Sequence, residues 1–204
     1  MGERSVTVTA EQTIDRLQSQ LRQAFTQWAD LSDQQWETVA TIFQERQVNA
    51  RDFVSFPGDD THELIFVGQG LLRFYYISAE GKETNKAFIA ENEFAGPLAS
   101  AMLGLPIYYG IQALESTTML VAPFAQFTAL YAQDLAFERL GRKLAEQLLV
   151  RKELRMRSML EQNARERYLD FLQKQPTLVD RIPQYHLASY LGITEVSLSR
   201  LKNS

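Results

Sequence analysis

The chain has 204 residues, of which 45% are hydrophobic and 23% are charged, and its formal net charge is −4. This apolar content is ample for one large or two small packed domains, so we expect a soluble globular protein. The sequence has neither a long apolar run nor a charged-then-apolar leader, which predicts a cytoplasmic protein with no membrane partner. Because there is no cysteine and only His62 and His186 offer imidazole, we expect no disulfide, no metal site and no cofactor.

Two amphipathic helices are predicted at the start of the chain. Apolar residues recur at intervals of three and four over residues 9–31. Ser32 then offers a capping residue for a second helix over residues 36–47. We therefore expect residues 1–48 to be N-terminal helices that pack on the next domain and carry no chemistry.

The pattern changes after Arg51 to short strands separated by turns. The predicted strands cover residues 52–56, 64–67, 71–77, 83–89, 111–114 and 117–121. Their near-regular spacing favours an antiparallel barrel or jelly roll (a double-stranded β-helix) over a parallel sheet. A short helix and loop interrupt them between residues 94 and 111. We assign residues 49–122 to this jelly roll, and the fold class to α+β.

A long helix is predicted from Pro123 through residue 162. Apolar side chains continue at three- and four-residue spacing while charges fill most of the other face; they are Phe137, Leu140, Leu144 and Leu148. Such a helix is more plausibly half of a two-stranded pair than a lone exposed helix. These four residues are therefore the predicted dimerisation seam of a homodimer.

The last segment, residues 163–204, has the spacing of a helix-turn-helix. Counted from Gln184, the small Ala188 is at position 5 and Gly192 is at position 9. Two steeply crossing helices need a residue without bulk at the first position and a left-handed turn residue at the second. Thr194 is placed to cap the second helix.

In a helix-turn-helix the second helix enters the major groove of double-stranded DNA. The predicted DNA-binding residues are Gln184, Tyr185, Thr194, Glu195, Val196, Ser197, Ser199, Arg200 and Lys202. From Arg139 onward there are 13 lysines and arginines against 7 acidic residues (net +6), whereas residues 1–138 carry 8 against 18 (net −10). This asymmetry favours attraction of DNA to one end of the molecule. The alternative is an ordinary helical hairpin packed inside a larger domain.

The order of these elements resembles the CRP/FNR family of bacterial transcription regulators. Its most specific pieces are residues 94–98, which are similar to the family's hydrophobic-Gly-Glu-Leu cassette, and residues 182–200. The resemblance implies a homodimer in which an effector pocket in the jelly roll adjusts the long helices. It also implies that two recognition helices bind a palindromic operator, and it leaves open a contact with RNA polymerase.

The chain departs from the family in its effector cassette. Pro97 stands where cyclic-nucleotide-binding members have a glutamate, and Ile107 and Tyr108 stand where they have an arginine pair. A buried phosphate without a cation is costly, so cAMP and cGMP are not expected to bind. The predicted pocket residues are Gly96, Pro97, Leu98, Ile107, Tyr108 and Tyr109, with Met102, Leu103 and Leu105 as further lining. Two alternatives stay open: a small apolar or aromatic effector, or a cassette filled as plain core.

Other functional classes have less support. We expect no enzyme and no catalytic residue, because no Gly-rich phosphate loop or Ser/His/Asp arrangement is present and solvation explains the paired Glu91 and Glu93. The competing hypothesis is a dimeric ligand-binding or protein-interaction module that no longer binds DNA specifically. The family's β-hairpin wing is not found after the recognition helix, which predicts fewer phosphate contacts.

Overall fold

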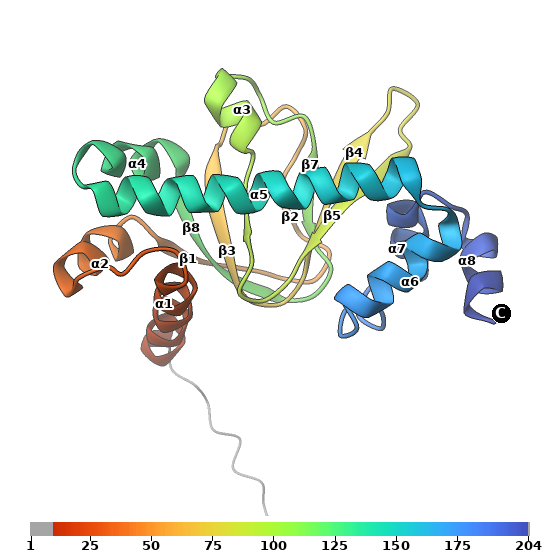
Figure 1. The fold of residues 1–204 in the computed structure, drawn as a ribbon, viewed down its shortest axis with the longest axis horizontal. Helices are drawn as coiled ribbons and strands as arrows, with labels where there is room; N and C mark the ends of the chain where they lie inside the picture. Colours follow the sequence, from red (N-terminus) through yellow and green to blue (C-terminus); the bar gives the residue numbers. More distant parts are fainter. Residues whose placement is uncertain (1–9, 204) are drawn as a thin grey trace, which may run out of the picture.

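The computed structural model describes residues 10–203 (Figure 1). Helix α1 spans Ala10–Thr26, so it ends before the predicted residue 31, and its predicted start at residue 9 lies outside the described residues. Helix α2 spans Asp33–Ala40. Ser32 caps it as expected: the Ser32 hydroxyl accepts from the Gln35 amide at 3.3 Å, and the Gln35 side chain accepts from the Ser32 amide at 2.9 Å.

The second helix does not continue to residue 47 as predicted. Gln44–Val48 is instead strand β1, which pairs antiparallel with the last strand of the sheet from Gln44 opposite Val121 to Val48 opposite Thr117. Pairing with a neighbouring strand satisfies this backbone and overrides a local helical pattern. The jelly roll therefore begins within the segment that the sequence assigns to the N-terminal helices.

Within residues 10–203, eight strands form two four-stranded sheets. After β1, the strands are β2 Phe53–Ser55, β3 Glu63–Gln69, β4 Leu72–Ile77, β5 Glu83–Ile89, β6 Phe94–Ala95, β7 Gly110–Ala113 and β8 Thr117–Pro123. The sheet orders are β1-β8-β3-β6 and β2-β7-β4-β5, with every pair antiparallel. The predicted jelly-roll-like architecture is confirmed. The inserted helix, α3, spans Leu98–Leu103.

Two apolar cores lie on opposite faces of the β1-β8-β3-β6 sheet. Between the sheets, Ile65, Met119 and Ile111 are buried with their neighbours. On the outer face, Phe66 and Leu120 pack against Leu21 of α1 and against the helices that follow the last strand. The N-terminal helices thus complete the core of the jelly roll, in agreement with their predicted packing role.

The helix predicted over residues 123–162 is broken into pieces. Helix α4 spans Phe124–Ala129, a 3-10 turn covers Leu130–Ala132, and helix α5 spans Leu135–Glu161. Asp134 causes the break: its carboxylate accepts from the Ala136 amide at 2.8 Å and from the Gln35 side chain at 2.8 Å. An aspartate that caps a helix in this way starts a new one. Helix α5 then crosses the front of the jelly roll from end to end (Figure 1).

Three short helices follow α5 in the part of the chain that the structure describes. They are α6 Ala164–Lys174, α7 Gln184–Leu191 and α8 Glu195–Lys202. We call α7 and α8 the C-terminal helical pair; with α6 it forms a cluster at the far end of α5 (Figure 1). Its own core contains Phe171, Leu187 and Leu198, and also Leu71 and Ala90 of the jelly roll. None of the helices within residues 10–203 is both long and apolar enough to cross a membrane.

Candidate functional site

The C-terminal helical pair turns at the glycine that the sequence singles out. Gly192 has φ +69° and ends α7, and the Ile193 amide donates to the Ala188 carbonyl at 3.0 Å. Only glycine adopts this left-handed conformation without steric cost. Thr194 caps α8 as predicted, because its hydroxyl accepts from the Ser197 amide at 3.2 Å.

In the C-terminal helical pair, the residues predicted to form its small core are buried, and the residues predicted to contact DNA are mostly exposed. Leu187, Ala188, Leu191 and Leu198 are buried. The predicted DNA-binding residues are exposed, with Ser197 half-buried; the exposed ones are Gln184, Tyr185, Thr194, Glu195, Val196, Ser199, Arg200 and Lys202. The two helices therefore present one outward surface of polar, cationic and small apolar side chains.

Helix α7 is docked on strand β5 through the side chain of Asn85. Its amide nitrogen lies 3.1 Å from His186 Nδ1 and donates to the His186 carbonyl at 3.1 Å, while the Asn85 backbone amide donates to the Ser189 hydroxyl at 3.0 Å. Burial, and then the charge of Arg73, lower the pKa of His186 to about 4. His186 is therefore neutral at physiological pH and serves as a docking residue, which its position in the sequence did not indicate.

Arg181 forms a second link between the C-terminal cluster and the jelly roll. Its guanidinium donates to the Glu91 carboxylate at 2.8 and 3.0 Å, to the Glu115 carboxylate at 2.7 and 3.0 Å, and to the Gly70 carbonyl at 3.2 Å. Burial alone would raise the pKa of Glu91, but its hydrogen bonds from Arg181 and from backbone amides keep it below the usual value. The interpretation of Glu91 as a merely solvated turn residue is wrong.

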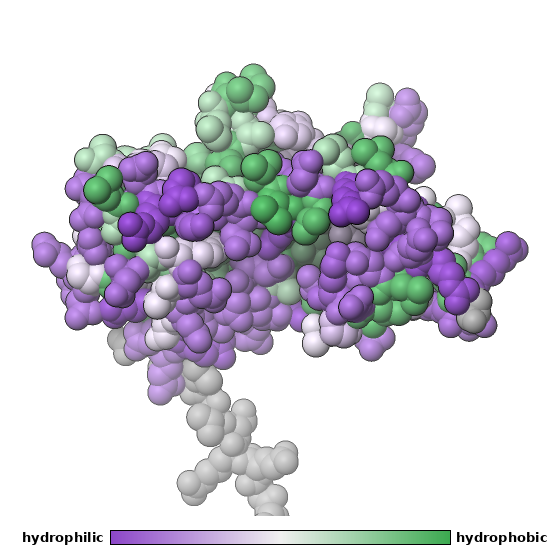
Figure 2. Space-filling model, in the orientation of Figure 1, coloured by the Kyte–Doolittle hydropathy of each residue, from purple (hydrophilic) through white to green (hydrophobic). Residues whose placement is uncertain are grey.

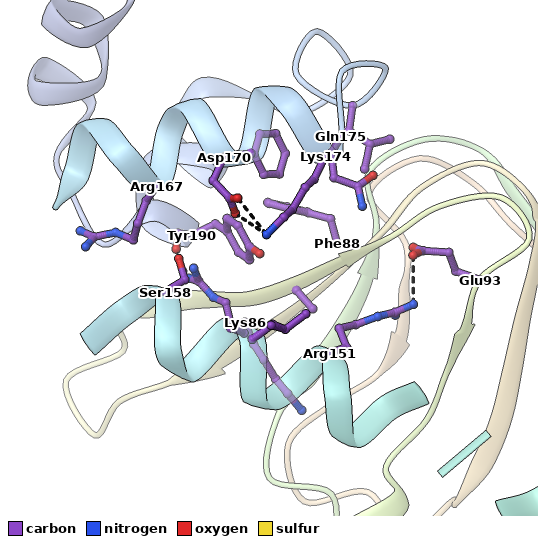
Figure 3. Close-up of a pocket in the computed structure, with 15 residues that line it drawn as sticks. Lys86, Phe88, Glu93, Arg151, Ser158, Arg167, Asp170, Lys174, Gln175 and Tyr190 are labelled. Carbon is purple, nitrogen blue, oxygen red and sulfur yellow. Dashed lines mark hydrogen bonds and ion pairs between the residues drawn. The ribbon is translucent and has the colours of Figure 1, made fainter. Parts of the chain in front are cut away.

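Glu93 is also bound rather than solvated. One of its oxygens accepts from Arg151 of α5 at 3.0 Å, and the other accepts from the Ala90 amide at 2.9 Å. Figure 3 shows this pair at the edge of a small hollow of about 210 Å³ between α5, α6 and β5. A second pair in the same view joins Lys174 to Asp170. Both carboxylates at this hollow are thus paired, while Lys86, Arg155 and Arg167 also line it without an ion pair to any residue that the structure describes.

A larger cavity of about 500 Å³ lies between the β4–β5 face and α5. Four of the six predicted pocket residues line it: Gly96, Leu98, Tyr108 and Tyr109. The other two, Pro97 and Ile107, do not line it. Ile107 is buried between the sheets. Both residues border a separate hollow, which the Arg46–Glu63 ion pair also lines. The further lining residues are also misplaced, since Met102, Leu103 and Leu105 are 74%, 69% and 50% exposed on the outside of the molecule.

The cavity is both aromatic and cationic. Tyr76 stacks on Tyr108 with ring centroids 6.2 Å apart, and Tyr109 meets both rings edge-on. The cations that line it are Lys86 from β5 and Arg151, Lys152 and Arg155 from α5. These cations could not be predicted from the sequence, because they become neighbours only when α5 folds over the sheet.

The predicted dimerisation seam lies inside the protomer. Phe137, Leu140 and Leu144 are 4%, 0% and 3% exposed in the core that they share with α1 and α2, and Leu148 packs against the same core. Side chains buried in their own chain cannot contact a partner, so the seam is wrong at Phe137, Leu140 and Leu144, whereas at the half-buried Leu148 it stays a prediction. The three- and four-residue spacing of apolar residues arises because this face of α5 packs on the jelly roll and the N-terminal helices.

Comparisons with known proteins agree with this architecture. Residues 45–134 match the cyclic nucleotide-binding domain family. No curated protein matches the sequence. Solved structures that resemble the chain include FixK2 from Bradyrhizobium japonicum, with 17% identity, a TM-score of 0.68, and coverage of 79% of this chain and 83% of that one.

Two other solved structures are similar. A putative transcriptional regulator of the CRP/FNR family from Eubacterium rectale has 16% identity and a TM-score of 0.67, over 85% of this chain and 83% of that one. A mutant of CooA from Carboxydothermus hydrogenoformans has 21% identity and a TM-score of 0.63, over 81% and 77%. Residues 45–134 thus form a domain of the cyclic nucleotide-binding type, and the chain shares its fold with a putative transcriptional regulator of the CRP/FNR family.

Proposed function

We propose that this protein is a sequence-specific DNA-binding transcription regulator that acts as a homodimer. The observation that carries the proposal is the C-terminal helical pair. Its turn glycine, its cap and its buried core agree with a helix-turn-helix, while the predicted DNA-contacting side chains are exposed on one surface. Structural neighbours that are CRP/FNR-type regulators support the same function.

The exposed face of α8 supplies the groups that read base edges in the major groove. Arg200 is the type of side chain that binds guanine through two hydrogen bonds, and Glu195 can accept from the amino group of cytosine. Val196, 62% exposed, can pack on a thymine methyl group. Gln184 and Tyr185 at the start of α7 are exposed, and we assign them to phosphate and flanking contacts.

The dimer interface of this proposal is a stripe on α5 different from the predicted seam. We call it the α5 stripe; it consists of Ala145, Leu149, Lys152, Met156 and Met159, all exposed. Their alternating spacing of four and three residues is that of a two-stranded coiled coil. Figure 2 shows apolar residues gathered over the middle of α5 on this face. Two copies joined here would carry two α8 helices, which suits an inverted-repeat operator.

The cavity between β5 and α5 is the effector site of this proposal. It shares strand β5 with the docking contact of α7, since Lys86 lines the cavity and the adjacent Asn85 contacts His186. It also shares Met156 and Met159 with the α5 stripe. A ligand in the cavity would therefore touch the elements that position both the DNA-reading helices and the dimer partner.

The cavity differs in charge from the cation-free cassette that the sequence predicts. The cavity does hold cations, so a buried phosphate would not lack a positive partner. No carboxylate lines the cavity within the described residues, however, so nothing there replaces the family's glutamate as an acceptor for the ribose hydroxyl. We retain the proposal that a cyclic nucleotide is not the effector on that ground.

The test compares two arginine substitutions on the duplex that the protein enriches from a randomised pool. Arg200→Ala should weaken binding to that duplex by about 1–3 kcal/mol, the cost of one good base contact, measured by fluorescence anisotropy. Arg139→Ala is the matched control, because it removes the same charge from an exposed position on α5. If both variants lose the same affinity, Arg200 contributes only its positive charge, and this result would contradict base reading by α8.

A further inference from the structure

Strand β5 contains a bulge that directs Lys86 into the cavity. Phe74 of β4 pairs with Ala87, but the next residue, Tyr75, pairs with Asn85, so Lys86 is an extra residue in the ladder. Alternation along a regular strand would place Lys86 on the face opposite to Ala87. With the bulge, Lys86 places its ammonium over the ring of Tyr109 in the cavity, while the neighbouring Asn85, which also borders the cavity, directs its side-chain amide to His186 of α7. Bulges that re-aim a side chain in this way are typical of functional sites.

Lys86 has no acidic partner in the cavity. Its ammonium lies 3.7 Å from the centre of the Tyr109 ring and 5.6 Å from that of Tyr76. Over residues 10–203 no ion pair joins it to a carboxylate, and no acidic residue lines the cavity. Burial, and then the nearby charge of Lys152, lower the pKa of Lys86 to about 8. A half-buried cation without an anion is a position that an anionic ligand would stabilise.

The other cations of the cavity are not equally available. Arg151 is paired with Glu93, and Arg155 donates to the Tyr190 carbonyl and lies 3.8 Å from the centre of the Tyr190 ring. Lys152 is exposed on the α5 stripe. Lys86 is therefore the cation best placed to bind a single negative charge inside the cavity.

The opposite wall of the cavity is aromatic. Tyr76, Tyr108 and Tyr109 form a contiguous cluster, and Phe74 lies 5.5 Å from Tyr109 between ring centres. Apolar surface predominates around them, with Leu98, Leu148 and Met156 in the lining. Such a wall packs well against the face or edge of a planar ring.

We propose that this cavity binds a small aromatic carboxylate, with its ring against the tyrosine cluster and its carboxylate on the ammonium of Lys86. A volume of about 500 Å³ accommodates a molecule of one or two rings. A single carboxylate is matched by the ammonium of Lys86 beside the tyrosine cluster, whereas the other cations, Arg151, Lys152 and Arg155, line the cavity from α5. The inference rests on the proposed function only in treating the ligand as an effector.

Isothermal titration of the purified full chain with benzoate, 1-naphthoate and the neutral 1-naphthalenemethanol tests the proposal. We expect binding of one carboxylate per chain and at least about tenfold weaker binding of the alcohol, because a charge-assisted hydrogen bond is lost. Lys86→Met should weaken 1-naphthoate binding about tenfold or more. Lys82→Met, an exposed lysine in the turn of the same hairpin, is the matched control and should bind as the unaltered protein does.

Lys86→Arg keeps the charge and should retain most of the affinity, which separates a charge effect from a folding defect in Lys86→Met. The proposal is overturned if no carboxylate binds, if the alcohol binds equally well, or if Lys86→Met is without effect. It is also overturned if cAMP or inorganic phosphate binds more tightly than 1-naphthoate. The titration contains no DNA, so its failure is distinguishable from a failure of DNA binding.

Discussion

The two halves of α5 have opposite surroundings although they form one continuous helix. In the first half, Phe137, Leu140 and Leu144 are buried against the N-terminal helices and the jelly roll. In the second half, Leu149 and Met156 are 64% and 52% exposed, and the helix borders the cavity and the C-terminal cluster instead. The first half thus stabilises the fold of the protomer. The second half has exposed apolar and cationic side chains, which we propose contact a ligand and a second chain.

This difference shows why helical periodicity by itself does not locate a dimer interface. An apolar stripe at three- and four-residue spacing predicts that a helix face is covered, but it does not say by what. Along α5 the covered face is satisfied within the protomer, and a second stripe with the same spacing, rotated around the helix, remains exposed.

The largest effect is expected for Leu140→Ala in the buried half. Leu140 is fully buried, so truncation should leave a cavity and lower the free energy of unfolding by about 2–5 kcal/mol. Urea unfolding followed by circular dichroism measures it. Because the loss is internal to the protomer, it should be the same at low and high protein concentration, and a loss that vanishes at high concentration would place Leu140 at an interface after all.

The next effect is expected for Leu149→Glu in the exposed half. A charge in the middle of the α5 stripe should weaken dimerisation by about 2 kcal/mol or more, because both copies bring it to the interface. Sedimentation equilibrium should then show a shift toward the monomer. Val150→Glu, on the same turn but outside the stripe and 55% exposed, is the control and should leave the dimer intact. Equal behaviour of the two variants would remove the α5 stripe as the interface.

A third effect concerns the docking of α7, which the second half of α5 supports through Arg155 and Tyr190. The folded-state pKa of His186, about 4, is below its ordinary value of about 6.5. The unfolded chain therefore binds the proton first as pH falls, so the contribution of neutral His186 is complete above pH 6.5. It is lost as pH falls from about 6.5 to 4, by about 2–3 kcal/mol in all.

Unfolding of the unaltered protein and of His186→Gln over this pH range measures that contribution. The free energy of unfolding of the unaltered protein should fall more steeply with decreasing pH than that of the variant. Parallel curves would show that His186 titrates normally, and hence that α7 is not firmly docked on β5. Asn85→Ala should weaken the same docking by about 1–3 kcal/mol, because it leaves the buried polar groups of His186 without their donor.

Much of the fold could be predicted from local pattern. The strands between Phe53 and Val121, the cap at Ser32 and the turn at Gly192 follow from alternation, capping chemistry and backbone conformation, all of which act over a few residues. The strand at Gln44–Val48 and the break at Asp134 were missed, because the first depends on pairing with β8 and the second on a local cap within an otherwise helical pattern.

Part of the candidate site could also be predicted from local pattern, and part of it could not. The exposed residues of α8 could be predicted, because a short helical pair carries its own pattern of buried and exposed positions. The cation of the cavity could not, because Lys86 enters it through a one-residue bulge that leaves no mark in the sequence. The pairing of Arg181 with Glu91 and Glu115 joins residues far apart in the chain and required the folded structure.

Selection of the purified protein on randomised duplex DNA, repeated with Leu149→Glu, tests whether this protein reads DNA as a dimer. The unaltered protein should enrich two inverted half-sites about one helical turn apart, with affinity that falls steeply as salt rises, and Leu149→Glu should lose the requirement for the second half-site. Failure of the folded, dimeric protein to enrich any sequence would contradict the account, and would instead favour a ligand-binding or protein-interaction module.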